Sequence, residues 1–196
     1  MKTDIQLNTV TKDDVFRIAS WLEDTSVNSM WYGPGEDGTP KHIGYDPKSA
    51  INANQVEWEF LFSHPDRIIR SIYVQEFGHI GEIQLLITPP LKEAELFILI
   101  GKKEVWGHHY GQIAVLLLLD IAFHKLDLHR VWVDVPEYNH IALHLFRRLG
   151  FTIEGSLRST HILNGEWKNS TVLGLLEDEY SRRRPGMWDK IMGVPA

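Results

Sequence analysis

Alternating apolar and polar residues predict most of the strands in this chain. Arg130 to Val135 is the clearest example, because Val131, Val133 and Val135 fall on one face. Asn164-Gly165 is a residue pair typical of a tight β-hairpin, so the two closing strands are expected to be joined there. The other strands are predicted at residues 5–10, 70–76, 79–87 and 95–101.

A period of three to four residues predicts the helices. Thr11 to Asp14 resembles a capping box with Asp at its last position, and it opens a helix that runs to Leu22. Residues 139–149 form an amphipathic helix that Gly150 closes. The apolar run Ile113 to Leu119 predicts a buried helix that extends to about Lys125. A further helix is expected over residues 49–62.

Two segments are predicted to lack regular structure. Thr25 to Lys48 is rich in glycine and proline, which indicates a long loop of a functional or mobile kind. Residues 181–196, beginning Ser181-Arg-Arg-Arg-Pro185, are expected to be an irregular C-terminal extension that is solvated or contacts another subunit. Residues 1–180 are then expected to form a single domain. Its order of elements predicts an α/β protein with a mixed sheet, part antiparallel and part βαβ.

The composition narrows the range of functions. A hydrophobic share of 43% and a charged share of 23% are ordinary for a soluble globular protein. The net charge of −6 argues against nucleic acid as the main partner and suits a cationic or amine substrate. Without cysteine there are no disulfides, thiolate nucleophiles or cysteine-based zinc sites. No signal peptide or membrane-spanning run is visible, so we expect a cytoplasmic protein that does not contact a membrane.

One segment predicts an anion site. Trp106-Gly107-His108-His109-Tyr110-Gly111-Gln112 lies between the strand at residues 95–101 and the buried helix. A glycine-bearing turn at a helix N-terminus presents unpaired backbone N–H groups and the positive end of the helix dipole. The segment therefore predicts a site for a phosphate or another anion.

An ordered set of motifs resembles the GCN5-related N-acetyltransferases, the GNAT superfamily, and most closely the branch of the ribosomal-protein alanine N-acetyltransferases. The resemblance covers about Ile5 to Leu176, and no single motif carries it alone. The motifs are Gly81-Glu82-Ile83, Trp106 to Gln112, Asn139-His-Ile-Ala142, Leu145 to Phe151, Glu154-Gly-Ser-Leu-Arg158 and Leu163-Asn-Gly-Glu-Trp167.

The resemblance implies a mostly antiparallel seven-stranded sheet with about four helices and a splayed central pair of strands. It implies acetyl-CoA as co-substrate, with the pyrophosphate held by Trp106, Gly107, His108, His109, Tyr110, Gly111 and Gln112. Ile98, Leu99 and Ile100 would lie along the pantetheine arm. Asn139 would meet that arm near the thioester, a role compatible with its alternative as a helix N-cap.

The chain departs from the family pattern at three positions. Trp106 stands where Gln or Arg is usual, and His109 stands at the first glycine, where its ring either narrows the approach to the phosphates or hydrogen-bonds to one. Phe146, expected at the coenzyme, replaces a tyrosine that reprotonates the thiolate in many relatives, so water or another residue takes that role, or none is needed.

Three residues are candidates for the general base that accepts the proton of the amine. They are Glu82 on the central hairpin, Glu95 at the start of the strand before the loop, and His161, where the ribosomal branch tends to carry glutamate. The alternative in each case is a side chain that faces solvent.

The acceptor is expected to meet Trp31, Tyr32 and Glu82. Aromatic rings in this loop suit an apolar group or an ammonium, and the alternative is that Trp31 and Tyr32 only anchor the loop. His140 and His144 have a spacing that suits zinc but no evident third ligand, so no metal is expected.

Together these features predict an N-acetyltransferase that moves the acetyl group of acetyl-CoA to a primary amine by direct attack. The acceptor is a small molecule or a peptide: a protein N-terminus, an aminoglycoside, a polyamine or an amino sugar. Two rivals remain, a coenzyme-binding module with little catalysis and a protein that binds another diphosphate. A homodimer is left open.

Overall fold

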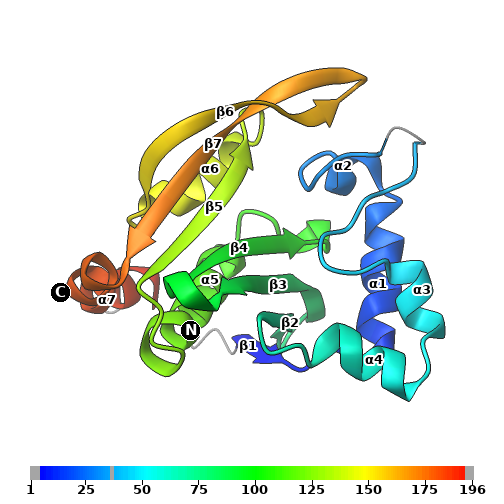
Figure 1. Ribbon diagram of the computed structural model, residues 1–196, viewed down its shortest axis with the longest axis horizontal. Helices are drawn as coiled ribbons and strands as arrows, with labels where there is room; N and C mark the ends of the chain where they lie inside the picture. The colour runs from blue at the N-terminus through cyan, green and yellow to red at the C-terminus, as the bar shows by residue number, and fades with distance from the viewer. Residues whose placement is uncertain (1–4, 36–37, 193–196) are drawn as a thin grey trace.

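The computed structural model describes residues 5–35 and 38–192. One sheet of seven strands organises the chain, in the order β1-β2-β3-β4-β5-β7-β6 (Figure 1). Every neighbouring pair is antiparallel except β4 and β5, which are parallel. This confirms the predicted fold class. The strands are β1 (Ile5–Asn8), β2 (Arg67–Val74), β3 (Gly78–Thr88), β4 (Glu93–Ile100), β5 (Arg130–Pro136), β6 (Thr152–Leu163) and β7 (Glu166–Leu176).

The parallel pair separates part-way along its length. Pairing between β4 and β5 starts at Glu93 with Arg130 and stops at Glu95 with Trp132, although both strands continue. In Figure 1 the two strands diverge beyond that point. The backbone edge that β4 turns towards β5 is therefore unpaired beyond Glu95, and it can pair with an extended ligand.

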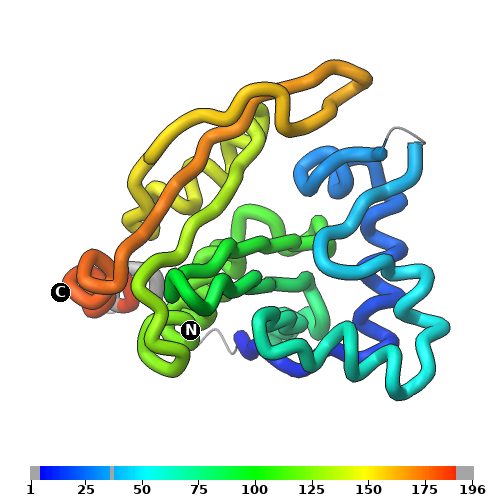
Figure 2. The backbone as a smooth tube through the Cα atoms, in the orientation of Figure 1, coloured from blue at the N-terminus to red at the C-terminus, as the bar shows by residue number. Residues whose placement is uncertain are grey.

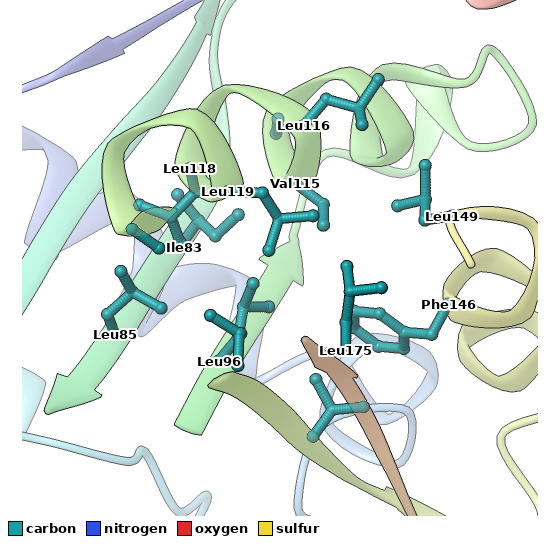
Figure 3. Close-up of a cluster of buried hydrophobic side chains, with 14 of the residues drawn as sticks. Ile83, Leu85, Leu96, Val115, Leu116, Leu118, Leu119, Phe146, Leu149 and Leu175 are labelled. Atoms are coloured by element: carbon teal, nitrogen blue, oxygen red, sulfur yellow. The ribbon is translucent and has the colours of Figure 1, made fainter. Parts of the chain in front are cut away.

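Helix α5 (Tyr110–Asp120) fills the core on one face of the sheet and continues as a π-helical turn, Ile121–Lys125. Its apolar residues are buried almost all round, as the continuous run Ile113 to Leu119 predicts. Helix α6 (His140–Arg148) closes the same core. Figure 3 shows how the side chains meet, with Val115, Leu116, Leu118 and Leu119 of α5 lying near Ile83, Leu85, Leu96, Phe146, Leu149 and Leu175.

The other face of the sheet carries the N-terminal helices. Helix α1 (Lys12–Leu22) begins with the predicted capping box, in which Thr11 and Asp14 satisfy each other's backbone N–H groups. The predicted loop opens with a short helix, α2 (Thr25–Asn28), that Asp24 caps. The single helix predicted over residues 49–62 is wrong: α3 (Pro47–Asn52) and α4 (Gln55–Phe62) are separate. Asn54 ends the run because it caps α4 in a second capping box with Glu57.

The prediction of an irregular tail is also wrong. Residues Glu177–Met192 form helix α7, and residues 193–196 lie outside the described part of the chain. Arg184 makes two hydrogen bonds to Asp120 at the end of α5, of 2.6 and 2.8 Å, and the Tyr180 hydroxyl donates to the same carboxylate. The arginine run looked solvated because Asp120 is far away in sequence. Because α7 and the short helices α2 and α3 are present, the described part of the chain has more helices than the four expected.

The closing hairpin reaches across the molecule. Asn164 and Gly165 both have positive φ, as the predicted tight turn requires, and they join β6 to β7. In Figure 2 the end of this hairpin extends towards the segment around α2. The two segments meet where the rings of Tyr32 and His161 stack, with centroids 5.2 Å apart. In the described part of the chain no helix is both long and apolar enough to cross a membrane.

Candidate active site

A groove of about 430 Å³ lies between the end of β4 and helix α6. It runs from the end of β4, past the turn before α5, to the exposed side of α6. Ile98, Leu99 and Ile100 line it, as do all the residues predicted to hold the pyrophosphate except His108. The remaining lining residues are Val27, Met30, Trp31, Val105, Asn139, Ile141, Ala142, His144, Leu145 and Arg148.

The turn before α5 presents backbone N–H groups to this groove. His109 is the residue before the first helical turn and has a left-handed backbone, with φ of 64°. The first N–H groups of α5, at Tyr110 and Gly111, precede any intrahelical acceptor. Their position and the helix dipole suit a diphosphate. The left-handed φ at position 109 explains why a glycine is usual there.

Trp106 stabilises the turn in place of the usual Gln or Arg. Its indole Nε1 donates a hydrogen bond of 2.8 Å to the carbonyl oxygen of Ile100, the last residue of β4. The ring is 37% exposed and also lines the groove. Among the lining residues the permanent cation is Arg148, on the opposite wall. Trp106 therefore stabilises the turn by a hydrogen bond, and the positive charge in the groove comes from Arg148 of α6.

Replacing His109 with glycine is expected to raise the free energy of unfolding by up to about 1 kcal/mol, because glycine adopts a left-handed φ without strain. The KM for acetyl-CoA should stay within about twofold, since the backbone N–H groups remain. Chemical denaturation and steady-state kinetics test both. His108→Gly is the matched control: position 108 lacks the positive φ, so glycine there should only destabilise. A rise in KM of about tenfold for His109→Gly would show instead that the imidazole binds a phosphate.

Asn139 connects helix α6 to the segment that follows α2. Its side-chain oxygen accepts from the Ala142 N–H at 3.0 Å, which confirms the helix cap. Its Nδ2 donates to the Met30 carbonyl oxygen at 2.8 Å. Asn139 also lines the groove, so the coenzyme contact remains a prediction beside the cap.

Two residues predicted at the coenzyme lie elsewhere. Phe146 is buried in the main core, with its ring centroid 5.2 Å from that of Phe151, because it is on the core face of α6. His108 is exposed and stacks on Tyr110 outside the groove. His140 and His144 are exposed, and no three His, Asp or Glu residues among those described are arranged to hold a metal ion.

Glu95 lies where β4 and β5 separate. It is half-buried and belongs to the last pair of the parallel ladder. Burial, with a contribution from the charge of Asp134, raises the pKa of its carboxyl to about 7. A carboxyl group with this pKa can accept a proton near neutral pH. Glu95 is therefore not the fully solvent-exposed side chain that was the alternative to a catalytic role.

The pKa of Glu95 predicts a pH dependence. If Glu95 is the base, kcat/KM should fall about tenfold for each pH unit below about 7 and level off above it, because only the ionised carboxylate accepts a proton. A steady-state profile from pH 5 to 9 measures this. Glu95→Gln should remove the limb near pH 7. A limb unchanged in that variant would assign the ionisation to another group.

His161 is buried, not solvent-facing, with 4% of its surface exposed. Its Nδ1 lies 3.0 Å from the Thr160 hydroxyl oxygen, and that hydroxyl donates to Ser170 Oγ at 2.8 Å. Since the Thr160 proton goes to Ser170, the Thr160 oxygen accepts from Nδ1–H of His161. Nε2 then carries the lone pair. Burial lowers the pKa of His161, so the ring is neutral.

Trp31 and Tyr32 anchor the loop, which was the alternative to acceptor binding, and their contact with the acceptor remains a prediction. Trp31 is 6% exposed, stacks on His42 and also lines the groove. Tyr32 packs between His161 and Phe97, with ring centroids 5.2 and 6.4 Å away. They anchor the loop to the sheet and place aromatic surface beside Glu95 and the groove.

Glu82 is neither solvent-facing nor in the groove. It is 2% exposed and accepts hydrogen bonds from the Tyr45 hydroxyl at 2.5 Å and from Gln84 Nε2 at 2.7 Å. His42 Nε2 lies 3.1 Å from Oε1 of Glu82, the oxygen that accepts from Gln84. Since Tyr45 and His42 belong to the N-terminal loop, Glu82 connects that loop to β3.

Asp134 and Tyr138 are two residues near this site that the sequence motifs did not predict. Asp134 is on the face of β5 opposite Val133 and Val135, and its charge influences both Glu95 and His161. Tyr138 precedes Asn139, and its hydroxyl is buried. The alternation of residues 130–135 was the available signal, because it places Asp134 on the same face as Trp132, the residue that pairs with Glu95.

Comparison with known proteins agrees with this geometry. Residues 4–152 match the acetyltransferase (GNAT) domain family. The chain belongs to this family. It is 30% identical to the spermidine N(1)-acetyltransferase of Escherichia coli (strain K12) over 188 residues, covering 93% of this chain and 92% of that protein. A shorter match, 27% identical over 104 residues, covers 53% of this chain and 60% of the spermidine N(1)-acetyltransferase of Vibrio cholerae.

Solved structures share the fold. Spermidine N-acetyltransferase from Vibrio cholerae in complex with CoA and spermine superposes with a TM-score of 0.74 at 21% identity, over 90% of this chain and 98% of that one. A probable acetyltransferase gives 0.76 at 20% identity, over 91% and 96%.

The chain is therefore an acetyl-CoA-dependent N-acetyltransferase, as predicted. The family assignment argues against a protein for another diphosphate, and similarity to an acetyltransferase over 93% of the chain favours an enzyme over a module with little catalysis. The superfamily resemblance is confirmed. The curated relatives reported above are spermidine acetyltransferases, whereas the sequence motifs favoured the ribosomal-protein branch.

Proposed function

We propose that this enzyme acetylates a primary amine of a polyamine, and that Glu95 is the group that accepts the proton of that amine. The observation that carries the proposal is the half-buried carboxyl of Glu95 at the divergence of β4 and β5, with a pKa of about 7 and a second carboxyl, Asp134, close enough to influence it. Two carboxyl groups beside aromatic rings favour a cationic acceptor. Full-length similarity to a spermidine acetyltransferase supports the same substrate class.

The chemistry that follows is a direct transfer. The ammonium group of the polyamine gives one proton to Glu95, directly or through water, and becomes a nucleophilic amine. Its nitrogen bonds to the thioester carbonyl carbon, and the bond from that carbon to sulfur breaks. The nitrogen then loses a second proton, which balances the proton that the departing thiolate takes up. The products are the N-acetyl amine and free coenzyme A, and one proton is released.

The same site receives both substrates from different sides. The groove with Ile98, Ile100 and the turn before α5 would hold acetyl-CoA, so its thioester would approach Glu95 along β4. Tyr32, Phe97 and His161 lie on the face of the sheet opposite α5 and would receive the amine. The unpaired edge of β4 gives the pantetheine arm backbone partners.

Release of coenzyme A thiol with a panel of acceptors tests this function. Spermidine, spermine and putrescine should be acetylated with kcat/KM at least about tenfold above that for an aminoglycoside or for a peptide with an N-terminal alanine. Thiol release without an acceptor gives the background hydrolysis. Preferred acetylation of the alanine peptide would assign the chain to the ribosomal-protein branch instead.

A further inference from the structure

Three buried polar atoms around Tyr32, which also lies near Glu95, lack a hydrogen-bond partner. They are Asp134 Oδ1, the Tyr138 hydroxyl and His161 Nε2, and none of them has a partner among the described residues. A buried polar group without a partner costs about 1–3 kcal/mol, so such groups are rare in native structures. Three in one region point to a ligand that supplies the missing hydrogen bonds.

These atoms share the chemistry of hydrogen-bond acceptors. A carboxylate oxygen only accepts, and the Thr160 contact leaves His161 Nε2 with a lone pair. A tyrosine hydroxyl accepts as well as donates. Asp134 has no cationic side chain in ion-pair contact within residues 5–35 and 38–192. An alkylammonium ion satisfies this group, because it brings several N–H donors and a positive charge.

The spacing separates this ligand from the amine at Glu95. Glu95 is paired with Trp132, and Asp134 is two residues further along β5 on the same face. Ladder geometry places the two Cα atoms roughly 8 Å apart, and the divergence of the strands adds to this distance. This spacing leaves room for two ammonium groups, one at each carboxylate, joined by a short alkyl chain. Tyr32 and Phe97 provide apolar surface beside Glu95 for such a chain.

We propose that Asp134, His161 Nε2 and the Tyr138 hydroxyl form a second subsite, which binds the amino group of the acceptor that is not acetylated. The subsite makes the enzyme select diamines and polyamines over monoamines, and it holds the reacting amine in place at Glu95. The inference rests on the proposed function for the class of substrate, and it assigns that selectivity to residues on β5, β6 and the turn before α6.

The test compares two acceptors that differ in one amino group, putrescine and n-butylamine. In wild type, kcat/KM should favour putrescine. Asp134→Asn should lower kcat/KM for putrescine by about 10- to 100-fold, the usual effect of losing a hydrogen bond to a charged group, and change the value for n-butylamine far less. The assays are run well above pH 7, where Glu95 is ionised in both proteins. Asp178→Asn, on the exposed side of α7, is the matched control and should change neither value.

Tyr138→Phe is a second variant that keeps the shape of the ring, and it should shift the ratio of the two acceptors in the same direction by a smaller factor. An equal loss for both acceptors in Asp134→Asn would overturn the subsite.

Calorimetric titration of putrescine in the presence of coenzyme A distinguishes the subsite from the proposed function. Weaker binding to Asp134→Asn than to wild type supports the subsite even if turnover is slow. Acetylation of neither acceptor by wild type, with equal putrescine binding to both proteins, overturns both.

Discussion

Glu95→Gln is expected to lower kcat for acetyl transfer to spermidine by roughly 10²- to 10⁴-fold, the contribution usual for a positioned general base. The KM for acetyl-CoA should change by no more than about twofold, because the groove that would hold the coenzyme is lined by other residues. Stopped-time assays of coenzyme A release measure both constants.

The same substitution should make the protein more stable at pH 8. The folded-state pKa of Glu95 is raised from 4.5 to about 7, so folding favours the neutral carboxyl. Its contribution to stability is complete below pH 4.5 and is lost as the pH rises through about 7. Glutamine has no charge at any pH, so the variant avoids the loss of folding free energy that the buried carboxylate causes in the wild type above pH 7. A variant that is less active and more stable cannot be explained by misfolding.

Glu93→Gln is the matched control, since Glu93 is two residues earlier on the same face of β4 and binds Arg130 at 2.6 Å. It should keep kcat within about threefold, because Glu93 is paired with Arg130 and lies before the point where β4 and β5 separate. Full activity of Glu95→Gln would contradict the role of Glu95 and direct attention to His161.

Glu82→Ala is expected to lower the free energy of unfolding by about 3 kcal/mol, because it leaves the Tyr45 hydroxyl and the Gln84 amide without their buried acceptor. For a chain of this size the corresponding fall in Tm is about 6–12 °C. The KM for the amine should also rise, since Glu82 holds the loop of Tyr45 and His42 to β3. Thermal unfolding monitored by circular dichroism gives the first quantity.

Glu82→Gln distinguishes a structural role from a catalytic one. Glutamine keeps an oxygen for the Tyr45 hydroxyl, so we expect a smaller loss of stability and a kcat within about threefold of wild type. Glu59→Ala, on the exposed side of α4, should leave Tm nearly unchanged. If Glu82→Gln folds normally and loses most of its kcat, then Glu82 is the base.

Local patterns were sufficient for much of the fold. Thr11 and Asp14 form the predicted capping box because that motif needs only neighbouring residues, and Asn164-Gly165 forms the predicted turn for the same reason. The turn at Trp106 to Gln112 was also predicted from its own residues, whereas the groove along β4 followed from the family resemblance, since its walls include the segment after α2 and helix α6.

The predictions that were wrong concern residues whose partners are far away in the sequence. Helix α7 forms where Arg184 and Tyr180 both reach Asp120, which a run of arginines does not reveal. Glu82 is buried because a loop some forty residues earlier covers it, as the contact with Tyr45 shows. The acceptor side also needed the structure, since Asp134 and His161 come from β5 and β6 and become neighbours only in the folded sheet.

The most direct test of the account is a competition between amines, followed by mass spectrometry of the products. Purified enzyme is given limiting acetyl-CoA with equimolar spermidine and a peptide that begins with alanine, and Glu95→Gln is assayed in parallel. We predict that the wild type places one acetyl group on spermidine and leaves the peptide almost unmodified, and that the variant yields only traces of acetylspermidine. Acetylation of the peptide in preference to spermidine, or undiminished acetylspermidine from Glu95→Gln, would contradict the account.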